Sequence, residues 1–109
     1  MTTNHQVEKV NSSIANLAEL SRSHGFLTVG FAGMHQDFPD FEAEINRCEA
    51  MGLRGVKIHP DIQEIDIDDP KMLPLYEIVA GRIRDEIQAR VDEAGIEIIE
   101  ARITYLAYA

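Results

Sequence analysis

The chain of 109 residues has no tryptophan, a single cysteine and few aromatic residues, which make up 6% of the sequence. Its core must therefore be built mainly from Ile, Val, Leu and Ala. The single cysteine, Cys48, excludes an internal disulfide and a thiolate metal cluster, and it lies on an apolar helix stripe that suits a small core residue better than a nucleophile. No apolar run is long enough for a membrane span, and the polar start MTTNHQ is unlike a signal peptide. We expect a cytoplasmic protein with no membrane insertion.

Basic residues are also scarce, with 10 Lys and Arg against 19 Asp and Glu, so the formal net charge is -9 at pH 7. A surface of that sign repels phosphate backbones, and nucleic acid is therefore not expected as a partner. Apolar residues make up 45% of the chain and charged residues 27%, as in ordinary soluble globular proteins. The length predicts a single domain, residues 1–109.

Three helix–glycine–strand units follow one another along the chain. The helices are predicted at 7–24, 37–51 and 74–94, the closing glycines are Gly25, Gly52 and Gly95, and the strands are predicted at 26–33, 54–60 and 96–109. Successive strands that are separated by helices imply parallel pairing with right-handed crossovers. The sequence therefore predicts an α/β fold in the order αβαβαβ, with helices packed on a three-stranded, mainly parallel sheet.

Apolar stripes at three- and four-residue spacing indicate which side of each helix packs on the sheet. The stripes are Val7, Val10, Ile14, Leu17 and Leu20 in the first helix, Phe41, Ile45 and Cys48 in the second, and Tyr76, Val79, Ile83, Ile87, Val91 and Ala94 in the third. The third stripe crosses Gly81 without losing phase. Helices on one side leave a second sheet face uncovered. The alternation places on it Thr28, Gly30, Ala32, Lys57, Ile98, Glu100, Arg102 and Thr104.

The segment within residues 20–80 that contains GLRGVKIHPDIQ, DDP and PLYE resembles a middle segment of the metal-dependent amidohydrolases with a TIM-barrel fold. The resemblance implies a fragment of a parallel α/β barrel. Members of that family bind metal through a His-x-His pair and through further His and Asp ligands on later strands. This chain contains no His-x-His pair and three predicted strands instead of eight, so the resemblance does not imply a complete metal centre.

Residues 82–109, with RDEIQARVDEAGIEIIEARITYLAYA, are similar to the last helix and strand of the stomatin/prohibitin/flotillin (SPFH, band 7) domain. That family scaffolds membranes and oligomerises through membrane-binding segments and long coiled coils, which match nothing in this chain. The two resemblances together imply a chimera, engineered or fused from fragments of unrelated folds. Its amidohydrolase-like part would be residues 1–80 and its SPFH-like part residues 81–109, with the seam inside the third predicted helix.

Polar side chains collect where the predicted strands end. His59, with Lys57 beside it, ends the second strand, while His35 and Asp61 lie at the same edge of the sheet. Imidazole and carboxylate groups suit zinc, so one interpretation is a metal held by His35, His59 and Asp61. The other is that His59 and Lys57 are remnants of a barrel lumen. We favour the remnant interpretation, because a zinc site also needs groups that orient its ligands.

The sequence therefore predicts a structural domain that is not an enzyme and has no catalytic residue, no cofactor and no known substrate. The alternatives are a vestigial metal-dependent hydrolase, with metal near His35 and His59, and an oligomerising interaction module of the SPFH type. A three-stranded sheet with two unpaired edges and an uncovered face also predicts self-association, as a homodimer.

Overall fold

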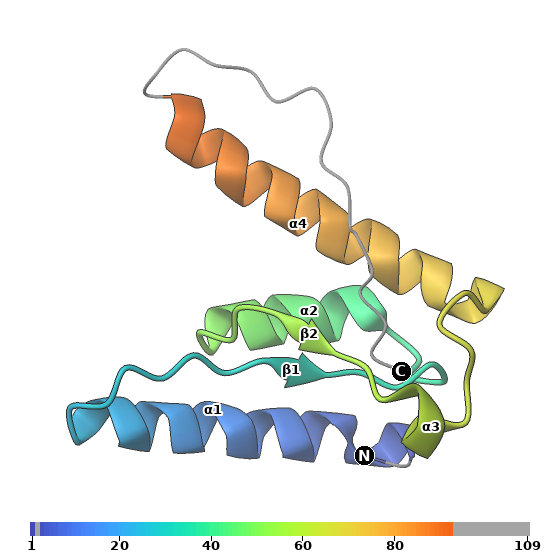
Figure 1. The fold of residues 1–109 in the computed structure, drawn as a ribbon, viewed down its shortest axis with the longest axis horizontal. Coiled ribbons are helices and arrows are strands. Elements are labelled where there is room, and N and C mark those ends of the chain that lie inside the picture. The colour runs from blue at the N-terminus through green and yellow to red at the C-terminus, as the bar shows by residue number, and fades with distance from the viewer. Residues whose placement is uncertain (2, 93–109) are drawn as a thin grey trace.

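The computed structural model describes residues 1 and 3–92, and its elements follow the chain as Figure 1 shows. They are the single-turn helix η1 (Asn4–Gln6), α1 (Val7–Ser23), β1 (Ala32–Gly33), α2 (Phe41–Ala50), β2 (Val56–Lys57), α3 (Pro60–Gln63), the single-turn helix η2 (Pro70–Met72) and α4 (Leu73–Val91).

The sheet consists of two parallel strands, in which Ala32 pairs with Val56 and Gly33 pairs with Lys57. The expected αβαβαβ fold with a three-stranded sheet is therefore wrong, because the described residues are mostly helical and surround only these two short strands. The third predicted strand, within 96–109, lies outside the described residues.

The two predicted strands shorten to two paired residues each. Between the end of α2 and Pro60, the chain has only a short connection with which to cross the sheet. Strand β2 ends at Lys57, and Pro60, the last residue of the predicted strand, is the first residue of α3. The residues that follow the second predicted strand belong to the short helix α3, which ends at Gln63 and has His59 at its N-cap. Two strands can pair only where their backbones run side by side. Because the segment that contains β2 is short, it limits the paired length of both β1 and β2.

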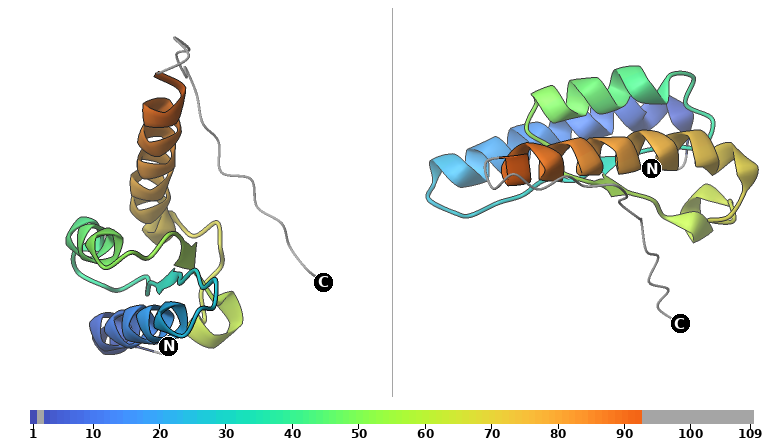
Figure 2. Two further views of the ribbon diagram at one scale, coloured as in Figure 1. Left: turned by 90° about the vertical axis from the view of Figure 1, so that its left-hand side faces the viewer. Right: turned by 90° about the horizontal axis from the view of Figure 1, so that it is seen from above.

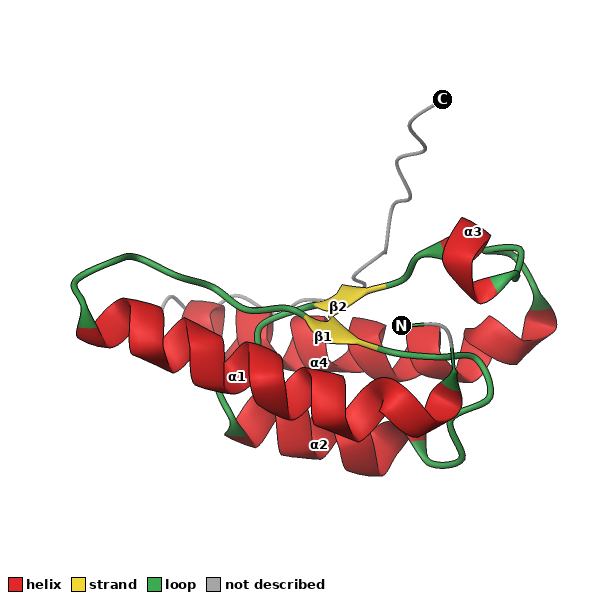
Figure 3. Ribbon diagram, turned by 90° about the horizontal axis from the view of Figure 1, so that it is seen from below, coloured by secondary structure: helices red, strands yellow, loops and turns green. Residues whose placement is uncertain are grey.

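Helices α2 and α4 lie on one side of the two strands, whereas α1 runs along the outer edge of β1, away from β2 (Figures 2 and 3). On the opposite side, the described residues place only the short α3, near the carboxyl ends of the strands. We call this opposite side the open face. Gly33 and Lys57 are register partners and share a side of the sheet, whereas the Ala32 and Val56 pair faces the helices.

The core lies between the strands and the three long helices. Its larger cluster consists of Val7, Met34, Ile45, Met72 and Leu75, and its smaller cluster consists of Ala15, Ala32, Cys48 and Leu53. Ile45 and Cys48 confirm the stripe that was predicted for the second helix. Val56 and Ile58 pack against the larger cluster, while Lys57 is exposed, as the alternation in the second strand predicts.

The face of α1 that packs on the core differs from the predicted stripe. Its buried residues are Val7, Asn11, Ala15 and Ala18, whereas Leu17 and Leu20 are 64% and 56% exposed. The close approach of α1 to the strand region explains the difference, because a Cβ added at Gly30 would lie 2.7 Å from Leu53 Cδ2 and 3.2 Å from Ile14 Cγ2. Only small side chains fit such a contact, so alanines rather than leucines face it.

The faces of the segment that leads into β1 are also the reverse of those expected. Gly30 and Ala32 are buried toward the helices, although the sequence placed them on the uncovered face. Leu27, Val29 and Phe31 are 98%, 60% and 52% exposed. The larger apolar side chains of this segment therefore face water, because the space toward α1 accepts only glycine and alanine.

Local signals fix the helix ends. Gly25 and Gly52 have positive φ angles of 86° and 87°, which confirms that they close the first two helices. Gly95 lies outside the described residues. Asp40 caps α2 by accepting a hydrogen bond from Ala43 N (3.1 Å), so the helix begins later than the predicted residue 37.

Helix α4 runs unbroken through Gly81, as predicted, but its stripe is only partly covered. Tyr76 and Val79 pack against the core, whereas Ile83 and Ile87 are 43% and 42% exposed. Figure 1 shows the reason, since α4 diverges from α2 toward its C-terminal end. The second half of α4 therefore adds less apolar burial than the sequence predicts.

Replacing Gly81 with alanine is expected to raise the free energy of unfolding by up to about 1 kcal/mol, because alanine has the higher helix propensity and restricts the unfolded chain. Gly81 lies inside α4, and a Cβ added there would meet no atom within 4 Å. Urea denaturation of both proteins measures the difference. A clear loss of stability in Gly81→Ala would contradict a continuous, unstrained helix at this point.

Candidate interaction surface

The two histidines of the predicted metal site are both engaged with nearby backbone. His35 is buried, and its Nδ1 accepts a hydrogen bond from Asp37 N (3.1 Å). His59 caps α3, where its Nδ1 accepts from Ile62 N (3.3 Å), and Asp61 is exposed on the same short helix. Within residues 1 and 3–92, no three His, Cys, Asp or Glu side chains form a group that could hold a metal ion.

Gln63, which no sequence pattern indicated, holds together the carboxyl ends of the strands. Its Nε2 donates to Met34 O (3.0 Å) and to Gln36 Oε1 (3.1 Å), while its Oε1 accepts from His59 N (2.9 Å). The Gln36 side chain in turn donates to Gln63 O (2.8 Å). A buried amide thus occupies the edge at which the sequence suggested a metal, and its bonds there are structural.

A second buried polar group joins α1, β1 and α2. Asn11 is fully buried; its Oδ1 accepts from Gly33 N (2.7 Å), and its Nδ2 donates to Gly33 O (3.0 Å) and to Glu44 Oε2 (2.9 Å). Arg47 completes the group with two donors to the Glu44 carboxylate, at 2.6 and 2.9 Å. The only sequence signal for this network is a polar Asn11 one helical turn from Val7 and from Ala15.

The network sets the protonation states of its members. Burial raises the pKa of Glu44, but hydrogen bonds from Arg47 and Asn11, together with the Arg47 charge, outweigh burial and leave the pKa below its ordinary value. Burial, with the Glu44 carboxylate nearby, raises the pKa of the Cys48 thiol to about 11. Cys48 is therefore a neutral thiol at pH 7, which suits a core residue and not a nucleophile.

Replacing Glu44 with glutamine is expected to cost stability at neutral pH, and less in acid. A carboxylate with a lowered folded-state pKa stabilises the fold above its ordinary pKa of 4.5, and this contribution is lost as the pH falls through the folded-state value. The difference in unfolding free energy between wild type and Glu44→Gln should therefore shrink below about pH 4.5. Urea denaturation across pH measures it, with Glu19→Gln, at an exposed position on α1, as the control. A difference independent of pH would contradict this account.

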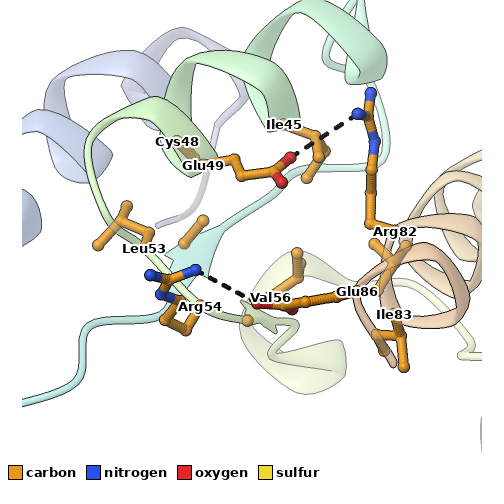
Figure 4. Close-up of a pocket in the computed structure, with 12 residues that line it drawn as sticks. Ile45, Cys48, Glu49, Leu53, Arg54, Val56, Arg82, Ile83 and Glu86 are labelled. Atoms are coloured by element: carbon orange, nitrogen blue, oxygen red, sulfur yellow. Dashed lines mark hydrogen bonds and ion pairs between the residues drawn. The ribbon is translucent and has the colours of Figure 1, made fainter. Parts of the chain in front are cut away.

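A small cleft of about 90 Å³ opens where α4 diverges from α2 (Figure 4). Its floor is apolar and includes Ile45, Leu53, Val56 and Ile83. Ion pairs cross its rim, from Arg54 to Glu86 (3.4 Å) and from Arg82 to Glu49 (3.8 Å). These rim charges are satisfied by each other and largely solvated, so the cleft presents no unpaired group that would recognise a ligand.

The most exposed of the large apolar side chains in the described residues lie in the segment that enters β1 and on the last turns of α1. We call residues 26–31 the edge segment; its exposed members are Phe26 (68%), Leu27 (98%), Val29 (60%) and Phe31 (52%). It runs back along the end of α1, since Phe26 N donates to Ser21 O (3.1 Å) and Arg22 Nη1 donates to Thr28 O (3.1 Å). These turns of α1 also expose Leu17 and Leu20.

The side chains exposed on the open face are not the ones that the strand alternation predicts. The alternation placed Thr28, Gly30 and Ala32 on the uncovered face, whereas the exposed residues are their larger neighbours in the edge segment. None of the described helices is long and apolar enough to cross a membrane. No protein-family model, curated protein or solved structure matches the chain.

Proposed function

We propose that this chain is a structural domain that self-associates as a homodimer and carries no catalytic activity. The observation that supports it is the edge segment, which exposes four large apolar side chains beside two more on α1. An exposed apolar patch of this kind commonly marks a site of protein association. A symmetric pair of identical chains is the commonest way to cover one.

The two alternatives fit the geometry less well. A metal-dependent hydrolase finds no support at the strand ends, because His35 and His59 each bond to neighbouring backbone. An SPFH-type module would associate through residues 81–109, whereas the exposed apolar side chains that support our proposal lie between Leu17 and Phe31. Self-association as proposed here is therefore independent of the SPFH resemblance.

We also propose that the chain joins two unrelated fragments near residues 80–82, on the strength of the two sequence resemblances. Helix α4 passes through this point unbroken, which a join in helical phase would permit. Helices α2 and α4 cover one side of a parallel strand pair and α1 lies along its edge, which an outer layer of helices cut from a barrel would permit. The open face would then correspond to the former lumen side.

Sedimentation equilibrium at tens of micromolar protein tests the self-association. We expect the mass of two chains, with dissociation on dilution. Raising the salt concentration should strengthen the dimer, because the two chains each carry a net charge of -9 and salt screens their repulsion. The mass of one chain at this concentration would refute the proposal, and a dimer that dissociates in salt would point to ion pairs instead of the apolar surface.

A further inference from the structure

A groove of about 190 Å³ lies on the open face, between α1 and α3. Its apolar lining includes Val10 and Ile14 of α1, Phe31 just before β1, and Ile62 of α3. An apolar cavity of about 150 Å³ holds one benzene ring, so this groove has room for an apolar group of roughly six carbons. We call it the open-face groove.

Two glycines allow the walls of the open-face groove to form. A Cβ added at Gly55 would lie 2.8, 2.9 and 2.9 Å from three atoms of the Phe31 ring, and one added at Gly33 would lie 2.8 Å from Met1 Cε. The Phe31 ring and the Met1 side chain therefore rest directly on backbone, in an approach that only glycine permits. Both side chains are held in place by this packing, although Phe31 is half exposed.

Lys57 brings a positive charge to the open-face groove. Lys57 and His59 are among its lining residues, whereas no described Asp or Glu is. Arg54, Lys71 and Arg82 each form an ion pair with a carboxylate, but no described residue forms an ion pair or hydrogen bond with the Lys57 ammonium group. An unpaired cation beside apolar walls is an arrangement that an anionic group on an apolar ligand would satisfy.

His59 supplies a second donor to the same groove. Its Nδ1 accepts a hydrogen bond from Ile62 N (3.3 Å), so the neutral ring carries its proton on Nε2 and can donate from that atom. The Gln63 side chain, by contrast, already bonds to the strand ends through both its nitrogen and its oxygen. Lys57 and His59 are therefore the two lining side chains that can bind an anion.

We propose that the open-face groove binds a small aliphatic carboxylate, whose negative group lies at Lys57 and His59. Its hydrocarbon chain lies against Val10, Ile14 and Phe31. One unpaired cation matches a single negative charge, and the apolar walls do not suit an ion that is polar on all sides, such as phosphate. This site goes beyond the homodimer proposed above and does not depend on it, although Phe31 belongs to both surfaces.

Titration with hexanoate, followed by methyl NMR at a protein concentration at which the chain is monomeric, tests the site. The Val10, Ile14 and Ile62 methyl signals should shift together and saturate in the millimolar range, as expected of a ligand with so few atoms. The Leu17 and Leu20 methyl signals are the internal control. They are exposed on α1 but do not line the groove, so they should not shift.

Lys57→Gln should weaken the binding of hexanoate about fivefold, since an exposed ion pair contributes at most about that factor. It should leave the binding of hexan-1-ol, which has the same chain and no charge, unchanged. Lys9→Gln is the matched control variant, because Lys9 is exposed on α1 and does not line the groove. Its affinity for both compounds should equal that of the wild type.

Three outcomes would overturn the carboxylate site. Shifts that spread equally to Leu17 and Leu20 would mean adsorption to exposed apolar surface, and equal affinity of Lys57→Gln and wild type for hexanoate would mean that no anion is recognised. Groove methyl signals that shift when the protein alone is concentrated, and no further with hexanoate, would assign the groove to a second copy. Failure of the homodimer would leave the site standing, because the titration is made on single chains.

Discussion

Leu27→Lys is expected to make the protein monomeric at concentrations at which the wild type is a dimer. Leu27 is 98% exposed, so the lysine costs the folded monomer almost nothing. In the dimer, it would bring an unpaired charge into an apolar contact, which is very unfavourable. A penalty of about 3 kcal/mol would raise the dissociation constant roughly a hundredfold. Sedimentation equilibrium measures the change.

Leu73→Lys is the matched control for this substitution. Leu73 is 52% exposed and lies at the start of α4, away from the edge segment, so the same change in residue and charge should leave the dissociation constant nearly unchanged. If Leu27→Lys dimerised as tightly as the wild type, or if both variants weakened association equally, the edge segment would not be the interface.

Asn11→Ala should lower the free energy of unfolding by about 2–4 kcal/mol, since it leaves several buried polar groups without a partner. Asn11 is fully buried and bonds to the N–H and C=O of Gly33 and to Glu44. Alanine has the better helix propensity, so the loss cannot come from the helix itself. Urea denaturation, with the midpoint and slope fitted together, measures the effect.

Asn16→Ala provides the comparison on the same helix. Asn16 is exposed on α1, and its replacement should be neutral or slightly stabilising, through helix propensity alone. Equal effects at the two positions would mean that the hydrogen bonds of Asn11 contribute nothing beyond propensity. In that case, the polar connection among α1, β1 and α2 would not explain how the fold is held.

The sequence predicted the helices well because their ends are set by local chemistry. Gly25 and Gly52 take up the left-handed conformation that stops a helix, and both were recognised from their place after an apolar stripe. The passage of α4 through Gly81 was recognised because the stripe keeps its phase. Such signals lie within a few residues of the feature that they determine, so one sequence suffices to find them.

The packing faces could not be found in the same way. Large apolar residues such as Leu17 and Leu27 were taken as the buried ones, but the contact between α1 and the strand region is too close for them. Gly30 and Ala18 meet there instead. Which side chains fit depends on the distance between elements, and that distance is set by the whole fold and not by local periodicity.

The residues of the candidate site could likewise be predicted only in part from the sequence. Their positions at predicted strand ends indicated His35 and His59 as metal ligands. In the structure, the Nδ1 atom of each ring accepts a hydrogen bond from a nearby backbone N–H group. Gln63 and Asn11 lie far in sequence from the groups they bind, Met34 and Gly33 respectively. No short motif marks such contacts, because a buried amide is recognised only once its distant partners are placed around it.

The central claim is that the edge segment is the interface between two copies of this chain. Isotope-filtered NOE spectroscopy on an equal mixture of labelled and unlabelled protein tests it most directly. We predict contacts between chains that involve the Leu27, Val29 and Phe31 side chains. A dimeric sample whose contacts between chains lie only elsewhere, for example along α4, would contradict the claim.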